Sequence, residues 1–293
     1  MSLAQLDAIL SPLAGQPRPP FSIEGVRQNW YVESDEIPTP LLMRRDVARG
    51  VAMEWLRRPD ARRDRAILYL HGGGYVCGSV RTHRTLTNAL AMCFDGTIVS
   101  VDYRLAPEHP CPAAIEDSVA AFREMIASGC PAESICIAGD SAGGGLAVAT
   151  ALLAREQGLP APGALWAISP WADLRNNSDS LDTLEPQDPI VFKDSLIQCA
   201  RHYLAGRAAD DPLASPILGE LSGLPPLLIH VGAREILLDD AVALARAAGI
   251  AGSEACLSIW PGMVHVWHLF AGKLEEADRA IDQAASWIEA RLA

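Results

Sequence analysis

The sequence lacks the basic surface that nucleic-acid binding requires. Its 24 Lys and Arg residues are outnumbered by 36 Asp and Glu residues, which gives a formal net charge of −12. Phosphate binding needs a concentrated basic face, so no nucleic-acid partner is expected. The one basic cluster, between Arg57 and Arg65, also contains Pro59 and Asp60, and we interpret it as a solvated turn between strands.

Membrane and export signals are also missing. The longest apolar stretch, around Leu146 to Ala154, is too short to cross a bilayer. The first twenty residues have no basic start followed by a continuous apolar segment, so they do not indicate a signal peptide. We therefore expect no membrane span and a cytoplasmic location.

Metal and disulfide motifs are absent as well. The seven cysteines are odd in number and form no Cys-x-x-Cys pair, which predicts neither a disulfide framework nor a zinc site. No His or carboxylate pair falls at zinc-ligand spacing on a helix. We expect no metal and no cofactor, and cysteines that are mostly small buried residues in a reducing compartment.

What the sequence does contain is a regular alternation of strand and helix patterns. Continuous apolar runs, typical of strands covered on both faces, occur at 66–70, 97–101, 134–138, 164–169, 227–231 and 255–260. Helical patterns occur between and after them, at 84–93, 113–128, 143–156, 239–248 and 273–292. The alternation predicts an α/β fold with a mostly parallel sheet flanked by helices.

Two segments depart from the alternation, and each carries one short helical pattern, at 3–10 and 194–203. A long strand-free segment in a compact domain usually covers something functional. We predict that residues 1–40 and 174–212 form a helical cap over the carboxyl-terminal edge of the sheet. Residues 41–173 and 213–293 would then form the catalytic domain. Surface decoration is the alternative interpretation.

The clearest chemical motif is Gly139-Asp140-Ser141-Ala142-Gly143, which follows a predicted strand and precedes a predicted helix. In this context Gly-x-Ser-x-Gly places the serine on a tight, strained turn that lifts its hydroxyl out of the sheet edge. The nearby helix N-terminus favours a developing negative charge. A serine that merely caps the helix is the alternative, but the strand–motif–helix order favours a nucleophile at Ser141.

A second glycine cluster, His71-Gly72-Gly73-Gly74-Tyr75, also follows an apolar run. Three successive glycines let backbone N–H groups approach a ligand without interference from side chains, as in the oxyanion holes of lipases and esterases. A phosphate-binding loop is the alternative. It is disfavoured because neither Gly-Lys-Ser/Thr nor Gly-x-Gly-x-x-Gly leads into a helix.

A serine nucleophile needs a histidine base, which in this type of fold follows it in the chain. His230 leaves little room for an acid before it, and His202 lies in the predicted cap. His265 follows the last apolar run and a Pro-Gly turn, on a loop that can return over Ser141. We therefore prefer His265 to His268, which lies three residues further on.

The carboxylate that orients the base is expected just after the strand predicted at 227–231. The candidates are Glu235, Asp239 and Asp240. Glu235 lies nearest the end of the strand. Asp239 and Asp240 lie where a helix begins, so capping and the helix dipole also explain them. The residues alone leave the choice open.

Together these motifs resemble the hormone-sensitive-lipase family of α/β-hydrolases, in its bacterial group of small carboxylesterases. The matching elements follow the order of that family from about residue 66 onward. They are His71-Gly72-Gly73-Gly74, Asp102 to Pro110, Gly139 to Gly144, Ser169-Pro170-Trp171, Gly232 to Asp240 and Gly262 to His265.

The resemblance implies an α/β-hydrolase fold and a catalytic triad of Ser141, His265 and Glu235. The usual acid of the family is an aspartate at the position of Glu235, so the glutamate is a departure. A glutamate is one methylene longer but can still accept from the imidazole N–H, and triads with either acid occur in α/β-hydrolases.

The same resemblance implies that the N–H groups of Gly73, Gly74 and Ala142 hold the oxyanion. The segment from Tyr103 to Pro110 resembles a structural signature that supports the oxyanion loop.

The implied activity is that of a serine carboxylesterase acting on short- to medium-chain acyl esters through an acyl-enzyme. A lactonase or amidase with the same triad is the alternative, and a non-catalytic small-molecule receptor is a further one. Competent residues at all triad positions argue against the receptor.

The expected partner is a small-molecule ester, and the candidate assembly is a homodimer. The aromatic candidates for an apolar acyl pocket are Phe21, Trp30, Tyr75 and Phe192, although core packing is the preferred interpretation for any one of them taken singly.

Overall fold

The computed structural model describes residues 2–13, 20–29 and 32–293. Within them, eight strands form one sheet with the order β1-β2-β4-β3-β5-β6-β7-β8. The strands are β1 (Leu42–Ala48), β2 (Val51–Arg57), β3 (Ala66–Leu70), β4 (Thr97–Asp102), β5 (Ile135–Asp140), β6 (Ala164–Ile168), β7 (Leu227–Gly232) and β8 (Ala255–Trp260). β2 pairs antiparallel with β1 and β4, and all other neighbours are parallel. The predicted mostly parallel sheet is confirmed.

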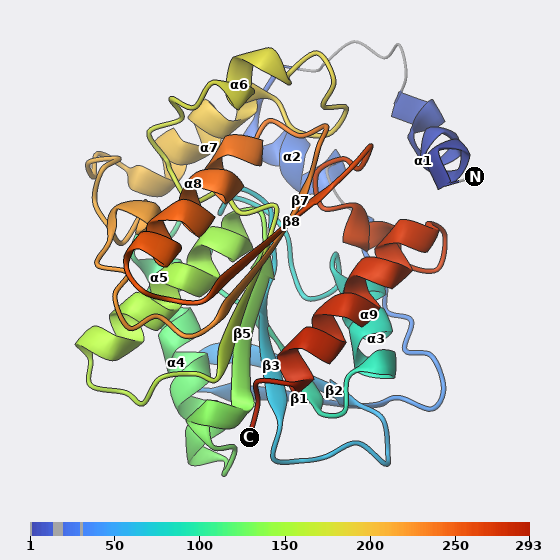
Figure 1. Cartoon of the computed structure of the whole chain (residues 1–293), viewed down its shortest axis with the longest axis vertical. Coiled ribbons are helices and arrows are strands. Elements are labelled where there is room, and N and C mark those ends of the chain that lie inside the picture. The colour runs from blue at the N-terminus through green and yellow to red at the C-terminus, as the bar shows by residue number, and fades with distance from the viewer. Residues whose placement is uncertain (1, 14–19, 30–31) are drawn as a thin grey trace.

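Helices cover both faces of this sheet (Figure 1). One face carries α4 (Ala113–Ala127), α5 (Ala142–Glu156) and α8 (Leu238–Ile250), and the other carries α3 (Arg84–Cys93) and α9 (Glu275–Glu289). Successive side chains of a strand point to opposite faces. In β3, Leu68 and Leu70 therefore join one core, whereas Ile67 and Tyr69 join the other. This two-sided burial is the reason that the strand reads as a continuous apolar run.

The first two strands were not predicted, because their sequences are not continuous apolar runs. β1 lies at the edge of the sheet and is largely exposed, with Val47 at 70% exposure. A tight turn at Arg49 and Gly50, both with positive φ (54° and 83°), joins β1 to β2. The basic cluster begins at Arg57, the last residue of β2, and continues into the connection to β3. Its interpretation as a turn between strands is therefore confirmed for the residues beyond Arg57.

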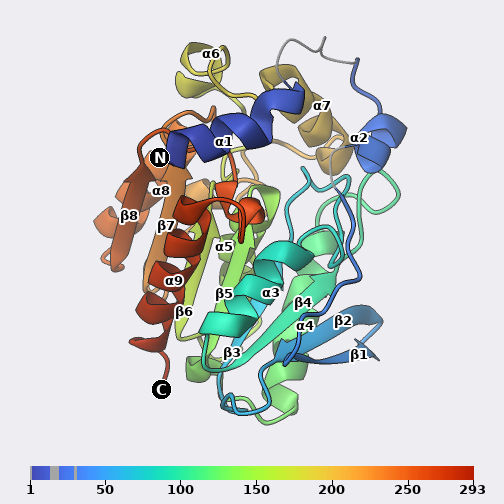
Figure 2. The same cartoon turned by 90° about the vertical axis from the view of Figure 1, so that its right-hand side faces the viewer.

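The segments predicted as a cap lie beyond the carboxyl ends of the parallel strands (Figures 1 and 2). They contain α1 (Ser2–Leu10), η1 (Ser11–Leu13), α2 (Ile23–Asn29), α6 (Ser180–Thr183) and α7 (Lys193–Leu204). Leu6 and Leu10 of α1 pack against Met263, Val264 and Trp267, which surround His265 in the chain. The boundaries of the cap stay a prediction, and residues 1, 14–19 and 30–31 within it lie outside the described part.

Three further short helices are η2 (Ala132–Ser134), η3 (Pro216–Leu218) and η4 (Trp267–Phe270). All seven cysteines are free thiols. None of the helices in the described residues has both the length and the apolar character needed to cross a membrane.

The order of the strands places two loops at a reversal point of the sheet. From β3 the chain moves to β4 on one side, and the next strand, β5, lies on the other side of β3. Ligands of open α/β sheets bind at such a reversal, beyond the carboxyl ends of the strands. The loop after β3 carries the glycine cluster, and the turn after β5 carries Ser141.

A buried carboxylate joins α8 to the segment that follows β6. Asp240 is 4% exposed, and its Oδ2 accepts hydrogen bonds from the backbone N–H groups of Ala172 and Asp173, both at 3.0 Å. Burial raises the pKa of Asp240 to about 7. The two N–H groups oppose this rise, whereas the charges of Asp173 and Asp239 add to it.

We expect this carboxylate to make the folded chain less stable as the pH rises. Its pKa in the folded state lies above the ordinary value of 3.8, so the folded chain keeps a proton that the unfolded chain releases between pH 3.8 and about 7. The free energy of unfolding of the wild type, relative to Asp240→Asn, should fall through this window by up to about 1.4 kcal/mol per pH unit. Urea unfolding of both proteins across the window tests this; parallel pH dependences would contradict it.

Candidate active site

Ser141 occupies a strained turn between β5 and α5, with φ 54° and ψ −121°. A Cβ added to Gly139 would lie 2.3 Å from the carbonyl oxygen of Gly143, and one added to Gly143 would lie 2.0 Å from that of Leu70. Side chains at the two flanking positions would therefore collide with backbone. This close packing explains in physical terms why the turn needs glycine on both sides of the serine.

His265 follows β8 and contacts the acid candidate Glu235, which follows β7. The distance from His265 Nδ1 to Glu235 Oε2 is 2.8 Å, and the two side chains are 6% and 0% exposed. This contact places the donor proton on Nδ1, which leaves Nε2 as the nitrogen able to accept a proton. The structure thus brings together the preferred base and one of the three acid candidates, the one that the family resemblance implied.

The other two acid candidates have different partners. Asp239 Oδ2 accepts a hydrogen bond from the backbone N–H of Ser180 at 2.7 Å, at the start of α6. Asp240 holds the segment after β6, as described above. Both lie in the first turn of α8. Among the three candidates that the sequence left open, Glu235 is the one whose carboxylate meets His265.

Sequence reasoning missed the role of Ser169, although the resemblance included this residue. Its Oγ donates to Glu235 Oε1 at 2.8 Å and accepts from the backbone N–H of Val266 at 3.1 Å. The N–H of Gly232 also donates to Glu235 Oε1, at 2.5 Å. One hydroxyl therefore joins the acid loop to the histidine loop. Its motif offered no chemical signal, because the role depends on three loops that are distant in the sequence.

The surroundings of His265 favour its charged form. Burial alone would lower its pKa, but the hydrogen bond and charge of Glu235 oppose this effect, and the charges of Asp188 and Asp140 add to the opposition. The net direction is a raised pKa. Such a site stabilises the imidazolium that forms when the histidine takes a proton.

The other three histidines that follow Ser141 have partners of their own. His230 Nδ1 and His268 Nε2 are 3.1 Å apart in a fully buried pair among Trp166, Trp260 and Trp267. Burial lowers the pKa of His230 to about 3 and that of His268 well below its ordinary value, so both rings are neutral. His202 lies on α7 and stacks on Phe21, with the ring centres 6.1 Å apart.

The glycine cluster after β3 forms a loop with left-handed backbone. Gly73, Gly74 and Tyr75 have φ values of 118°, 60° and 65°. A Cβ on Gly73 would lie 2.2 Å from the carbonyl oxygen of Cys77, and one on Gly74 would lie 2.8 Å from Sγ of Cys199 in α7. Both conformation and space therefore require glycine at these two positions.

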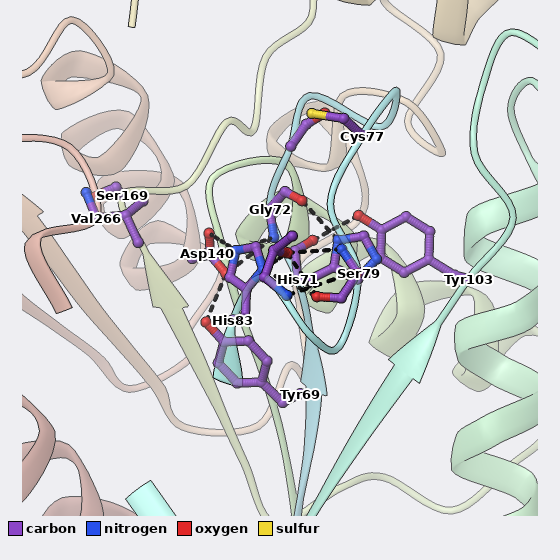
Figure 3. Close-up of polar contacts among 12 residues, drawn as sticks. Tyr69, His71, Gly72, Cys77, Ser79, His83, Tyr103, Asp140, Ser169 and Val266 are labelled. Carbon is purple, nitrogen blue, oxygen red and sulfur yellow. Dashed lines mark hydrogen bonds and ion pairs between the residues drawn. The ribbon is translucent and has the colours of Figure 1, made fainter. Parts of the chain in front are cut away.

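A buried polar network fixes this loop against the turn that carries Ser141 (Figure 3). Asp140, fully buried, accepts from Tyr69 OH at 2.7 Å and from the backbone N–H of Gly72 at 3.1 Å. His83 Nε2 lies 3.2 Å from the other carboxylate oxygen. Burial would raise the pKa of Asp140, but His83 and the hydrogen bond from Tyr69 outweigh it and lower the pKa. A charged Asp140 therefore anchors the first glycine of the loop.

The residue before the glycines is held from the opposite side. Tyr103 OH donates to the backbone oxygen of His71 at 2.6 Å, and the two rings stack with centres 4.1 Å apart (Figure 3). Burial lowers the pKa of His71 to about 3, so its neutral ring donates from Nδ1 to the carbonyl oxygen of Gly72 at 2.7 Å. The support that the Tyr103 segment was expected to give this loop is thus a specific hydrogen bond.

The aromatic candidates for an acyl pocket have varied positions. Tyr75 is 2% exposed and stacks on Tyr203 of α7, with ring centres 3.8 Å apart. Phe21 and Phe192 are partly buried, and Trp30 lies outside the described residues. Core packing accounts for Tyr75.

Comparison with known proteins bears on the fold and on the enzyme class. A family model described as alpha/beta hydrolase fold matches residues 67–269. The chain is 40% identical to the esterase EstE5, solved after soaking with p-nitrophenyl butyrate, with a TM-score of 0.91 over 99% of this chain and 98% of that one. It is 39% identical to an esterase from the bacterial hormone-sensitive lipase family, with a TM-score of 0.92 over 100% and 98% of the two chains.

The chain belongs to the hormone-sensitive-lipase family of α/β-hydrolases. It is also 46% identical to an acetyl-hydrolase of Streptomyces hygroscopicus over 80% of this chain and 78% of that protein. It is 31% identical to a carboxylesterase/phospholipase, LipF, of Mycobacterium tuberculosis over 98% and 78% of the two chains. The expected fold and the expected enzyme class, a carboxylic ester hydrolase, are confirmed.

We predict that Gly72→Ala reduces kcat for p-nitrophenyl butyrate by about a hundredfold, the cost of misplacing catalytic groups by about 1 Å. The added Cβ would lie 2.2 Å from Asp140 Oδ2 and 3.0 Å from its backbone oxygen, so the loop with Gly73 and Gly74 must move. Gly249→Ala is the matched control, since its Cβ meets nothing within 4 Å. Equal kcat values for the two variants would contradict this account of the loop.

Proposed function

We propose that this esterase hydrolyses short- to medium-chain acyl esters with Ser141 as nucleophile, His265 as general base and Glu235 as the acid of the triad. The observations that carry the proposal are the buried 2.8 Å contact between His265 Nδ1 and Glu235 Oε2 and the strained turn that holds Ser141. A neutral serine is a weak nucleophile, and an oriented imidazole is what activates it.

In the first half of the reaction, His265 Nε2 takes the proton of Ser141 as Oγ attacks the ester carbonyl carbon. The imidazolium donates from Nδ1 to Glu235, which keeps its negative charge throughout. His265 then gives the proton to the departing alcohol oxygen as the carbon–oxygen bond of the ester breaks. In the second half, water attacks the acyl-enzyme by the same route, and the products are a carboxylic acid and free Ser141.

The tetrahedral intermediates carry a negative oxygen that needs hydrogen-bond donors. In the proposal these donors are the backbone N–H groups of Gly73, Gly74 and Ala142. The strained loop after β3 and the first residue of α5 supply them, and the N-terminus of α5 adds a favourable dipole. Because their backbones are held by buried contacts, the donors need little reorganisation as the charge develops.

The preference for shorter acyl chains is supported by aromatic residues packed beside the nucleophile. The N–H of Trp171, whose side chain is fully buried, donates to the backbone oxygen of Ser141 at 2.9 Å. Tyr75 lies between Trp171 and Tyr203, with ring centres 6.0 Å and 3.8 Å away. We infer that these buried rings leave less room for a long acyl chain. The acetyl-hydrolase relative and the neighbour soaked with p-nitrophenyl butyrate also favour short acyl groups.

We predict that Ser141→Ala lowers kcat/KM for p-nitrophenyl butyrate by at least about 10⁴-fold, because no other group supplies the attacking oxygen. The control is Ser134→Ala, because Ser134 directly precedes β5, the strand that leads to Ser141. This variant should retain wild-type activity. The assay is steady-state hydrolysis with p-nitrophenyl esters of increasing acyl length, alongside circular dichroism of each variant. A folded Ser141→Ala enzyme that turns over at the wild-type rate would exclude the proposed nucleophile.

For the acid, we expect Glu235→Ala to lower kcat by about 10³- to 10⁴-fold, since His265 loses the partner that holds its tautomer. Asp239→Ala, which removes a carboxylate four residues away that binds Ser180, should cost far less. The two variants are compared by kcat at saturating substrate. Similar losses in both would show that Glu235 is not the orienting acid.

A further inference from the structure

A second carboxylate, Asp188, lies near the catalytic histidine and was not among the sequence candidates. It belongs to the segment between α6 and α7, in the predicted cap, and is 2% exposed. Its Oδ1 accepts hydrogen bonds from the backbone N–H groups of Ile190 at 2.9 Å and Val191 at 3.0 Å. These two bonds fix the carboxylate on its own segment.

The other oxygen of Asp188 reaches the acid loop. Oδ2 accepts from the backbone N–H of Ile236 at 3.0 Å. Ile236 directly follows Glu235 in the chain, so this bond ties the backbone beside the catalytic acid to the cap. Ser169 and Gly232 hold the Glu235 carboxylate from the sheet side. Glu235 is therefore held in place twice. Ser169 and Gly232 bind its carboxylate, and Asp188, in the predicted cap, binds the backbone of the next residue, Ile236.

The charge of Asp188 also acts on His265. The charged groups facing this ring are Glu235 on the loop after β7, Asp188 before α7 and Asp140 at the end of β5, and each favours the imidazolium. Burial raises the pKa of Asp188; the charge of His265 and the three N–H donors oppose this effect, and the net direction is a raised pKa. The three backbone donors favour the charged form of Asp188. In a buried site, a negative charge stabilises a nearby positive charge more strongly than it does in water.

We propose that Asp188 is a positioning residue for the esterase reaction: the cap segment contributes a second carboxylate, which fixes the Glu235 loop and stabilises the His265 imidazolium. The inference rests on the proposed roles of His265 and Glu235. It assigns the cap a part in the chemistry that is separate from enclosing the substrate.

The test is the pH dependence of kcat/KM for p-nitrophenyl butyrate in the wild type, Asp188→Asn and Asp188→Ser. Activity requires neutral His265, so the acid limb of the profile reports the pKa of this residue in the free enzyme. Removing a negative charge favours the neutral ring, and the limb should therefore move to lower pH in both variants. At the same time kcat should fall about tenfold, the equivalent of one pKa unit of lost interaction in the transition state.

The variants separate charge from structure. In Asp188→Asn, the amide oxygen can accept from the N–H groups of Ile190 and Val191. In Asp188→Ser, the hydroxyl can accept from the same loop. If one variant does not fold, the other still provides the measurement. Asp188→Glu keeps the charge and should leave the limb at its wild-type position. The position of a limb does not depend on the fraction of active enzyme, so partial unfolding cannot imitate the shift.

Asp240→Asn is the structural control, because Asp240 is also a buried carboxyl group that accepts two backbone hydrogen bonds, and its pKa of about 7 means that the variant tests packing rather than loss of charge. It should leave both kcat and the acid limb unchanged. If Asp188→Asn and Asp188→Ser keep the wild-type limb, or if Asp240→Asn shifts it equally, the inference is wrong. An active Ser141→Ala enzyme would instead overturn the proposed function, so the two failures are distinguishable.

Discussion

The mechanism proposed for this enzyme depends on one buried contact, that of Glu235 with His265. A carboxylate with no solvent exposure is costly unless hydrogen bonds satisfy it, and Glu235 receives them from Ser169, Gly232 and His265. The bond to Glu235 fixes the proton of His265 on Nδ1, so that Nε2 is free to accept one. The loops after β6, β7 and β8 all meet at this carboxylate, and their arrangement follows from its need for partners.

A second constraint is the close approach of backbone at the reversal point of the sheet. The turn at Ser141 and the loop at Gly72 lie so near each other that a single added carbon would meet Asp140 or backbone oxygen. The charged Asp140 joins the two by accepting from Gly72, and Tyr103 holds the same loop from its other side. The donors proposed for the oxyanion therefore derive their rigidity from the buried polar groups below them, as electrostatic preorganisation requires.

Much of the fold was predictable from the sequence, because strands such as Ile67 to Leu70 are buried on both faces and read as continuous apolar runs. β1 and β2 were not predicted, because their sequences contain no continuous apolar run; β1 is an exposed edge strand. Motif spacing singled out Ser141 and His265 but left three carboxylates open. The family resemblance implied Glu235, and its contact with His265 distinguishes it from Asp239 and Asp240, which have other partners. Ser169 and Asp188 could not be predicted, because their contacts join segments far apart in the chain and leave no local pattern.

The most direct measurement of the central claim is covalent trapping with an organophosphonate ester, followed by intact mass and peptide mass spectrometry. The account predicts one adduct per chain, on Ser141, with loss of activity in proportion to labelling. In the Glu235→Ala variant, labelling should be much slower. Complete inactivation with the adduct on another residue, or full labelling at an unchanged rate without Glu235, would contradict the triad.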